Sequence, residues 1–502
     1  MTSKPTLFSW GRLFNLIQQI AWALFLVTLP VTSFPYLPHV IGGTALVRPL
    51  SIYPLLVLLI IATLPRLFTG AVPRTIYTFL PFVLIALVAS LLSLLKGIEP
   101  MLGVTVSDRI LRALLTLGIG SAIYLTVAIL PRTPHELRLS LRWLYVGFIA
   151  ALAWGTLQIA YVIDFNPDYY HFLMKLQTYI STRKIFFNRV SGMTYEPNWF
   201  AEQISFLLIP WLLASVLSGY SAFTWRWRKL TIEWLLLGWS IVVLVFTFSR
   251  AGLINLVLLL ILGLVFFRVR QAHKVTKPHT RLAAWGRRLL EAALVVSLFI
   301  GLVFAASTRN DFFARIWGYW STVEERTVAD YFNYLGFGAR FMYAEAAYNT
   351  YAANPVLGVG LGNYAFYFDK MLPDEFLART PEVLRILTPE VGRSRLITPK
   401  NLYFRILAET GLLGMAAFTA FIIAVLGCAL FLWLSREQQQ RFWGTASLLG
   451  LCVFLAAGFS FDSLAIPNMW VVFGLITAAA WVYARQEESA DQPPPDSIMI
   501  KG

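Results

Sequence analysis

The sequence predicts an all-α integral membrane protein of about twelve transmembrane helices, with one large extramembrane loop that itself contains helices. Hydrophobic residues make up 58% of the 502 residues and charged residues only 13%. In soluble domains about a quarter of the residues are charged. Apolar runs of about 17 to 24 residues follow one another closely until a polar stretch of roughly ninety residues, Asn310 to Lys400, interrupts them.

Each apolar run is long enough to cross a bilayer as a helix. The first run lacks a small-residue cleavage pattern and is too long for the core of a signal peptide, so we expect it to remain as a span. We divide the chain into nine N-terminal helices within 1–306, the loop 307–400, three helices within 401–486 and a disordered tail 487–502. The runs lie at 13–34, 50–65, 76–95, 111–131, 143–163, 198–218, 232–249, 251–267, 289–306, 410–434, 442–461 and 467–484.

The basic residues indicate how the chain is oriented. The formal net charge is +15, and Lys and Arg cluster in short loops between the apolar runs. The rule that basic loops stay in the cytoplasm explains this pattern, so no nucleic-acid partner is needed. With both termini cytoplasmic, the basic excess falls on one side of the membrane. Three pieces then face the outer side: the 310–400 segment, the loop near 164–197 and the tight turn at 248–252.

The two cysteines and the acidic residues give no sign of a metal or another cofactor. Cys428 and Cys452 lie within apolar runs, where we expect them to pack as small apolar side chains. No acidic pair and no His/Cys cluster has the spacing of metal ligands. We therefore expect arginine, rather than a metal ion, to neutralise any anionic substrate.

Arg250 is the first candidate site residue, because it separates two apolar runs in VVLVFTFSRAGLINLVLLL. A guanidinium keeps its charge in proteins and needs an anionic partner or water. Its planar fork suits two oxygens of a diphosphate, and Ser249 could add a donor; the alternative is an arginine that reaches the lipid headgroups. Arg189 and Arg340 are further outer-side arginines that suit an anionic headgroup, although each alone is typical of a surface.

Two other features of the outer pieces have alternative interpretations. Glu196 precedes Pro197, which favours an extended backbone followed by a helix start. Its carboxylate is either a base or the partner of an arginine that orders the loop. The run Gly358–Gly362 either turns backbone N–H groups toward phosphate or forms an ordinary turn, and we favour the turn.

Ionisable residues inside the apolar runs are scarce. Those close to them, such as Glu202 and Glu409, lie within about a turn or two of a run's end. Ion-coupled transporters usually need ionisable groups near the membrane midplane and broken helices in related halves, and neither is evident. The sequence therefore disfavours a transporter.

Four stretches of the chain, taken in order, resemble the superfamily of O-antigen ligases and polymerases, which are bacterial envelope glycan enzymes. They are RVSGMTYEPNWFAEQ, FSRAGLINL, ARFMYAEAAYNTYAANPVLGVGLGNY and NLYFRILAETGLLGMAAF. The resemblance covers roughly residues 185–435, and the first five spans only by topology. It implies an all-helical lipid-linked glycosyltransferase fold in the inner membrane, with a large periplasmic loop and no metal.

The resemblance also implies roles for particular residues. Arg250 and outer arginines such as Arg189, with Arg340 as a possible third, would hold the diphosphate of an undecaprenyl-linked glycan, and Asn401 would contact substrate. The family usually has His-Asn where this chain has Lys400-Asn401. Because lysine is a cation at neutral pH, we expect Lys400 to contact phosphate or glycan, and Glu196 to receive or orient the acceptor proton.

The implied reaction is glycan transfer from undecaprenyl diphosphate to a hydroxyl, with inversion at the anomeric carbon. A ligase uses a lipid A–core sugar or a protein hydroxyl as the acceptor, whereas a polymerase uses another growing glycan. The sequence does not distinguish these two. A polysaccharide exporter or flippase is the alternative from another class, and the scarcity of midplane ionisable groups disfavours it.

Overall fold

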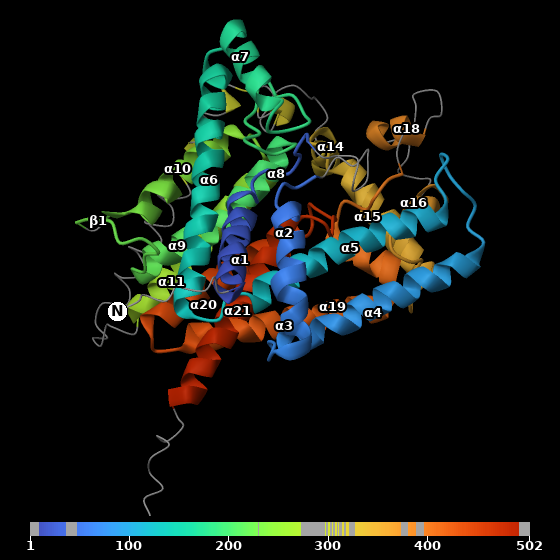
Figure 1. The fold of residues 1–502 in the computed structure, drawn as a ribbon. Helices are drawn as coiled ribbons and strands as arrows, with labels where there is room; N and C mark the ends of the chain where they lie inside the picture. The colour runs from blue at the N-terminus through green and yellow to red at the C-terminus, as the bar shows by residue number, and fades with distance from the viewer. Residues whose placement is uncertain are drawn as a thin grey trace, which may run out of the picture.

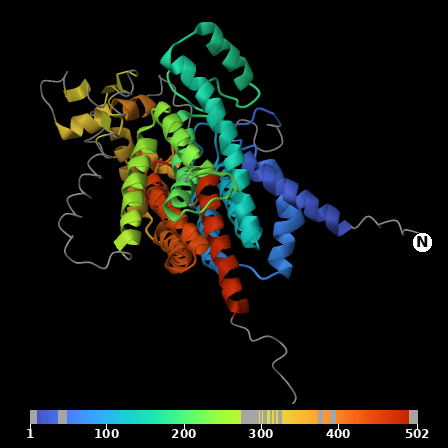
Figure 2. The same cartoon turned by 90° about the vertical axis from the view of Figure 1, so that its left-hand side faces the viewer.

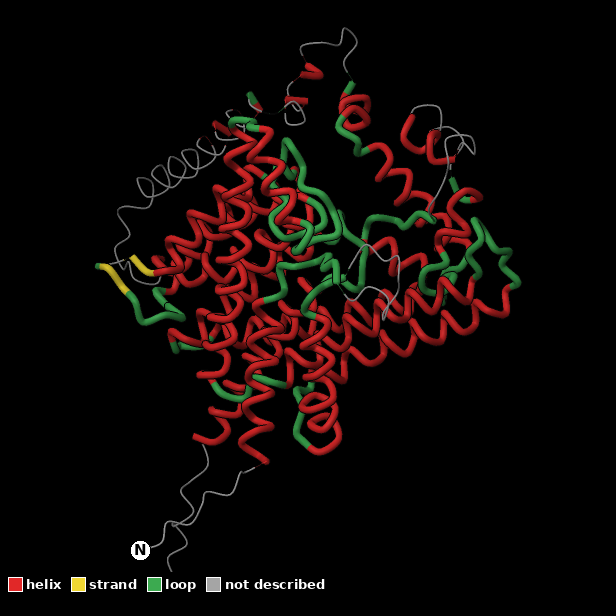
Figure 3. Tube along the Cα trace, turned by 45° about the horizontal axis from the view of Figure 1, so that its top comes forward, coloured by secondary structure: helices red, strands yellow, loops and turns green. Residues whose placement is uncertain are grey.

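The computed structural model describes residues 10–36, 48–228, 230–272, 327–372, 380–387 and 396–490, with single residues between 297 and 320. The predicted all-α class is confirmed, since the regular elements of the described residues are helices apart from one antiparallel pair of short strands, β1 (Arg226–Trp227) and β2 (Leu230–Thr231) (Figure 1). Figure 3 shows this strand pair in yellow at the edge of the helices.

The helices follow the predicted apolar runs. Nine described helices are long and apolar enough to cross a membrane, and two shorter apolar helices accompany them. They correspond to all the predicted runs except 289–306, most of which lies outside the described residues. The elements are α1 Trp10–Val27, α2 Ile52–Leu58, η1 Leu59–Thr63, α3 Leu64–Thr69, α4 Thr75–Ser93, η2 Leu94–Lys96, α5 Val106–Ile129, α6 Pro134–Ile163, α7 Pro167–Gln177, α8 Pro197–Glu202, η3 Gln203–Leu208, α9 Ile209–Ser218, α10 Ile232–Phe246, α11 Arg250–Ala272, α14 Val328–Tyr334, α15 Gly338–Ala353, α16 Tyr364–Tyr367, η5 Phe368–Lys370, α18 Pro381–Leu387, α19 Leu402–Leu434, α20 Gln438–Ala457 and α21 Pro467–Ala490.

The centre of the bundle is aromatic. The ring of Phe79 on α4 lies 5.2 Å from that of Tyr124 on α5, 5.0 Å from Phe421 on α19 and 5.4 Å from Trp470 on α21. Between membrane helices, van der Waals packing supplies much of the attraction, because lipid tails are as apolar as the side chains. Interlocked rings of this kind therefore hold the four helices in register.

Helix α19 is broken at Gly411, whose backbone angles are φ 65° and ψ −165°. Within a bilayer, backbone groups freed by a break need partners inside the protein. The stretch 355–360 supplies them from the large loop, which runs alongside the break. The bonds run from Val359 N–H to Ala408 O (3.0 Å), Gly360 N–H to Glu409 O (2.9 Å), Leu412 N–H to Pro355 O (2.8 Å) and Leu413 N–H to Val356 O (3.2 Å).

This arrangement answers the question about the glycine run. Gly358, Gly360 and Gly362 all have positive φ, which glycine adopts without strain. The N–H of Leu361 donates to Ser90 Oγ at 3.1 Å, and those of Gly358, Val359 and Gly360 donate to backbone oxygens, so these four amides bind protein groups. The run is the turn that we favoured, and it lets the loop approach α19 closely.

The outer pieces predicted from the sequence gather at one end of the bundle. Figures 1 and 2 both place α7, α14 and α18 there, while the end of α21 points the other way. Helix α21 runs to Ala490, so residues 487–490 are helical, where the sequence predicted disorder. The rest of the predicted tail lies outside the described residues.

Candidate functional site

The loop before α8 is held by a buried glutamine of α6. The side-chain oxygen of Gln158 accepts hydrogen bonds from the N–H groups of Ser191 (2.9 Å) and Gly192 (3.0 Å), and its amide nitrogen donates to Gly192 O (3.1 Å). A fully paired buried amide of this kind makes the backbone around it rigid. Arg189 is therefore presented from a fixed position.

Arg189 bridges the start of α8 and the turn between α10 and α11. Its Nε donates to Thr247 O at 2.9 Å, and its Nη2 donates to Asn198 Oδ1 at 2.8 Å and to Phe248 O at 3.4 Å. The pKa of Arg189 is lowered to about 10, chiefly by burial; the nearby Glu196 raises the pKa and Arg250 lowers it. The guanidinium is thus still charged at neutral pH.

Arg250 begins α11, directly after this turn. Ser249 caps the helix, since its Oγ accepts the N–H of Gly252 at 3.3 Å, so the hydroxyl already has a structural role. Arg250 Nη1 donates to Leu335 O at the end of α14, 2.5 Å away. The structure therefore brings Arg189, Arg250 and the large loop together, and we call Arg189 and Arg250 the arginine pair.

Glu196 lies next to the arginine pair but has a different partner. Its carboxylate is 2.8 Å from Arg183 Nη1, and both side chains are about a third exposed, at 37% and 35%. The guanidinium of Arg183 also lies over the rings of Phe186 and Tyr195, 4.6 and 4.7 Å from their centroids. The extended backbone of Glu196 and the helix start at Pro197 are as predicted. The sequence analysis missed Arg183, because charge alone did not separate it from other loop residues.

Lys400 and Asn401 lie at the start of α19. The backbone N–H of Lys400 donates to Asp462 Oδ2 at 2.7 Å, and its ammonium lies 5.8 Å from the centroid of the Tyr343 ring on α15. Asn401 caps the helix: its Oδ1 accepts the N–H groups of Tyr403 (3.0 Å) and Phe404 (3.2 Å). Its oxygen thus stabilises the helix start.

Two further cationic side chains, Arg340 and Arg405, bind the segment at 460–462 near Lys400. Arg340 Nη1 donates to Ser460 O at 3.4 Å, and Arg405 Nη1 donates to Asp462 O at 2.6 Å. Arg405 is buried and pairs with Glu409, 3.0 Å away. The sequence analysis missed Arg405, although its spacing of four residues from Glu409 on a helix predicts such a pair.

The predicted site residues therefore form two groups. Arg189 and Arg250 meet at the turn before α11, whereas Arg340, Lys400 and Asn401 meet around the segment at 460–462. Among the residues that the structure describes, no three His, Cys, Asp or Glu side chains are placed to hold a metal ion. The chemistry that both groups offer is the donation of charged hydrogen bonds to an anion.

These features define the chain as a polytopic, all-α membrane protein in which two groups of cationic side chains lie beside the large loop. Residues 235–419 match the family model described as O-antigen ligase, and this match supports the resemblance to the O-antigen ligase superfamily. The matched segment runs from α10 into α19 and includes Arg250 and Lys400. A comparison with curated proteins gave no match. The predicted resemblance is confirmed, and it supports membrane glycan transfer of the ligase or polymerase type.

Proposed function

We propose that this protein transfers a glycan from undecaprenyl diphosphate to an acceptor hydroxyl, as an inverting, metal-independent O-antigen ligase of the bacterial inner membrane. The observation that carries the proposal is the arginine pair. Arg189 donates to the turn that Arg250 directly follows, and the turn lies within the matched family domain. Two forked cations beside each other suit the two phosphates of the leaving group.

In the proposed reaction the oxygen of the acceptor hydroxyl bonds to the anomeric carbon. The bond between that carbon and the phosphate oxygen breaks, and its electron pair leaves with the diphosphate. The arginine pair stabilises this growing negative charge from prealigned positions, where the loss of one donor commonly slows a reaction about a hundredfold or more. The hydroxyl proton passes to the Glu196 carboxylate or through it to solvent.

The deletion of the gene tests this function. We expect the lipid-linked glycan to accumulate and the finished surface glycan to disappear. Accumulation of long lipid-linked chains fits a ligase, while accumulation of single repeat units indicates a polymerase. If purified protein in vesicles moves the lipid-linked glycan across the membrane without forming a new glycosidic bond, the protein is an exporter or flippase and the proposal fails.

The roles of Lys400 and Glu196 separate under mutation. Lys400→Arg is expected to retain measurable transfer, because the ammonium supplies only charge next to Tyr343. Glu196→Gln is expected to slow the chemical step more than it weakens donor binding. Both effects are measured in a single-turnover transfer assay with purified lipid-linked donor. An inactive Lys400→Arg, together with an active Lys400→His and an unaffected Glu196→Gln, would assign the base to position 400 instead.

The proposed orientation places the large loop in the periplasm and both termini in the cytoplasm. In a protein whose Cys428 and Cys452 are replaced by alanine, a cysteine at exposed Tyr348 on α15 should react in intact cells with a membrane-impermeant thiol reagent. A cysteine at Arg226 on β1, also exposed, should react only after the cells are broken. The reverse labelling pattern would invalidate the orientation and the outer position of the site.

A further inference from the structure

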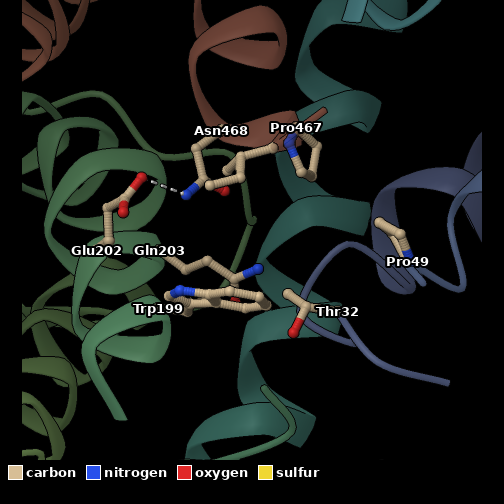
Figure 4. A pocket seen from close by; sticks show the side chains of 8 residues that line it. Thr32, Pro49, Trp199, Glu202, Gln203, Pro467 and Asn468 are labelled. Atoms are coloured by element: carbon tan, nitrogen blue, oxygen red, sulfur yellow. Dashed lines mark hydrogen bonds between the residues drawn. The ribbon is translucent and has the colours of Figure 1, made fainter. Parts of the chain in front are cut away.

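A narrow pocket lies between α8 and the start of α21 (Figure 4). Its free volume is about 10 Å³, which is room for roughly one water-sized group. Glu202 lies one helical turn, about 6 Å of rise, beyond Asn198, the residue that binds Arg189. The pocket is lined by Thr32, Pro49, Trp199, Glu202, Gln203, Ile466, Pro467 and Asn468.

The lining of this pocket holds three side chains with acceptor oxygens, Glu202, Gln203 and Asn468, beside the Trp199 indole and the Thr32 hydroxyl, which can donate. Gln203 is 1% exposed, and its amide nitrogen already donates to Leu29 O at 3.1 Å. Asn468 is 2% exposed, and its amide nitrogen donates to Glu202 Oε1 at 3.2 Å. The side-chain oxygens of both residues are buried without a hydrogen-bond partner among the described groups. An unsatisfied buried oxygen is costly, and the half-buried Glu202 is the acceptor that an occupant can reach, so this pocket favours an occupant that donates.

The local helix geometry supports a built site. Residues at neighbouring positions of a regular helix point in different directions, yet Glu202 and Gln203 both line this pocket. The wide π-helical segment η3 begins at Gln203, directly after α8. Such segments occur frequently at functional sites.

The acceptors and the walls together indicate the kind of occupant. An ionised phosphate presents only acceptor oxygens, so it suits the donors of the arginine pair. The acceptor oxygens of the pocket instead suit a group that donates a hydrogen bond. Trp199, Pro49, Ile466 and Pro467 provide apolar walls beside the oxygens. A sugar presents a hydroxyl donor together with an apolar C–H face, which suits an aromatic ring. Only one group the size of a hydroxyl fits inside, so the sugar ring itself would lie at the mouth.

We propose that the pocket formed by Trp199, Glu202, Gln203 and Asn468 is a hydroxyl-binding subsite for a sugar of the transferred glycan. It holds a hydroxyl that does not react, about one helical turn from the residues that hold the diphosphate. This inference rests on the proposed function and deepens it, because it assigns the recognition of the neutral glycan to side chains other than the arginines.

The experiment compares Glu202→Gln with Glu345→Gln, a change of the same chemistry at an exposed position of α15. Each purified variant in lipid nanodiscs is assayed for undecaprenyl diphosphate binding and for transfer from the lipid-linked glycan. We expect Glu202→Gln to lower kcat/KM for transfer at least about tenfold, since the amide presents one acceptor oxygen where the carboxyl group presents two. Binding of undecaprenyl diphosphate, which carries no sugar, should not change, and Glu345→Gln should match the wild type in both assays.

Two variants at position 199 test the subsite independently of any folding defect caused at position 202. Trp199→Leu removes the ring and should also lower kcat/KM about tenfold, whereas Trp199→Phe should retain most of it, with unchanged melting temperatures in both. Wild-type transfer by Glu202→Gln would mean that the pocket holds only water and would overturn the inference. Transfer that stops when choline replaces sodium would identify a cation site and would also overturn it. A wild-type protein that transfers no glycan would instead refute the proposed function, and the subsite with it.

Discussion

Replacing Arg250 with lysine is expected to abolish nearly all glycan transfer while leaving the amount of protein in the membrane unchanged. The guanidinium uses Nη1 to bind Leu335 O at the end of α14, and a planar fork of this kind can donate to two oxygens at once. Lysine keeps the charge but presents a single compact ammonium, so it cannot reproduce this fork. Transfer is measured with purified lipid-linked donor, and abundance by immunoblot of membranes.

The matched control is Arg226→Lys, the same change at an exposed residue of β1, where we expect wild-type transfer. If Arg250→Lys retains substantial activity, the arginine is only an anchor at the membrane surface. In that case the arginine pair would not explain the stabilisation of the leaving group.

Gly411→Ala is expected to destabilise the protein by about 2–4 kcal/mol, because only glycine readily adopts φ 65° and ψ −165°. An added Cβ would also come within 2.3 Å of Val356 O, so the backbone contact between the large loop and the break in α19 would have to open. We expect a lower melting temperature and less protein in the membrane. The end of the bundle away from the large loop should be affected last, since the break joins α19 to the loop.

Gly427→Ala provides the control within the same helix. A Cβ added there meets nothing within 4 Å, so we expect the melting temperature to stay the same or rise slightly. Equal melting temperatures for both variants would show that the positive φ at Gly411 does not constrain α19.

Much of the fold could be predicted because a bilayer accepts few structures. Long apolar runs have to satisfy their own backbone groups, so they form helices, and the sequence placed them well. Two helix starts were exceptions. Helix α6 begins at Pro134, where the sequence predicted a run from 143, and helix α19 begins at Leu402, where the sequence predicted a run from 410. Arg405 and Glu409 made this first part too polar for a hydropathy argument, but in the structure they pair with each other inside the protein.

The candidate site was predicted less completely. Pro197 correctly indicated the extended backbone at Glu196, since proline restricts the residue before it. The partner of Glu196 is Arg183, which no local pattern indicates. Glu202 drew attention only as a charge near the end of a run, yet it lines a pocket with Asn468, which lies on α21.

By itself the sequence determined the class of protein and its resemblance to the O-antigen ligase superfamily. Hydrophobicity, the length of the apolar runs and the order of the four motifs are properties of the linear sequence. They can be recognised without knowing how the helices pack. Only the tertiary structure decided which polar groups meet. It joined Arg250 to Leu335, closed the break at Gly411 with residues 355–360 and set Asn468 beside Glu202. These partners lie far apart in the sequence, and in an apolar surrounding each needs the other to satisfy its hydrogen bonds, so only the folded chain determines them.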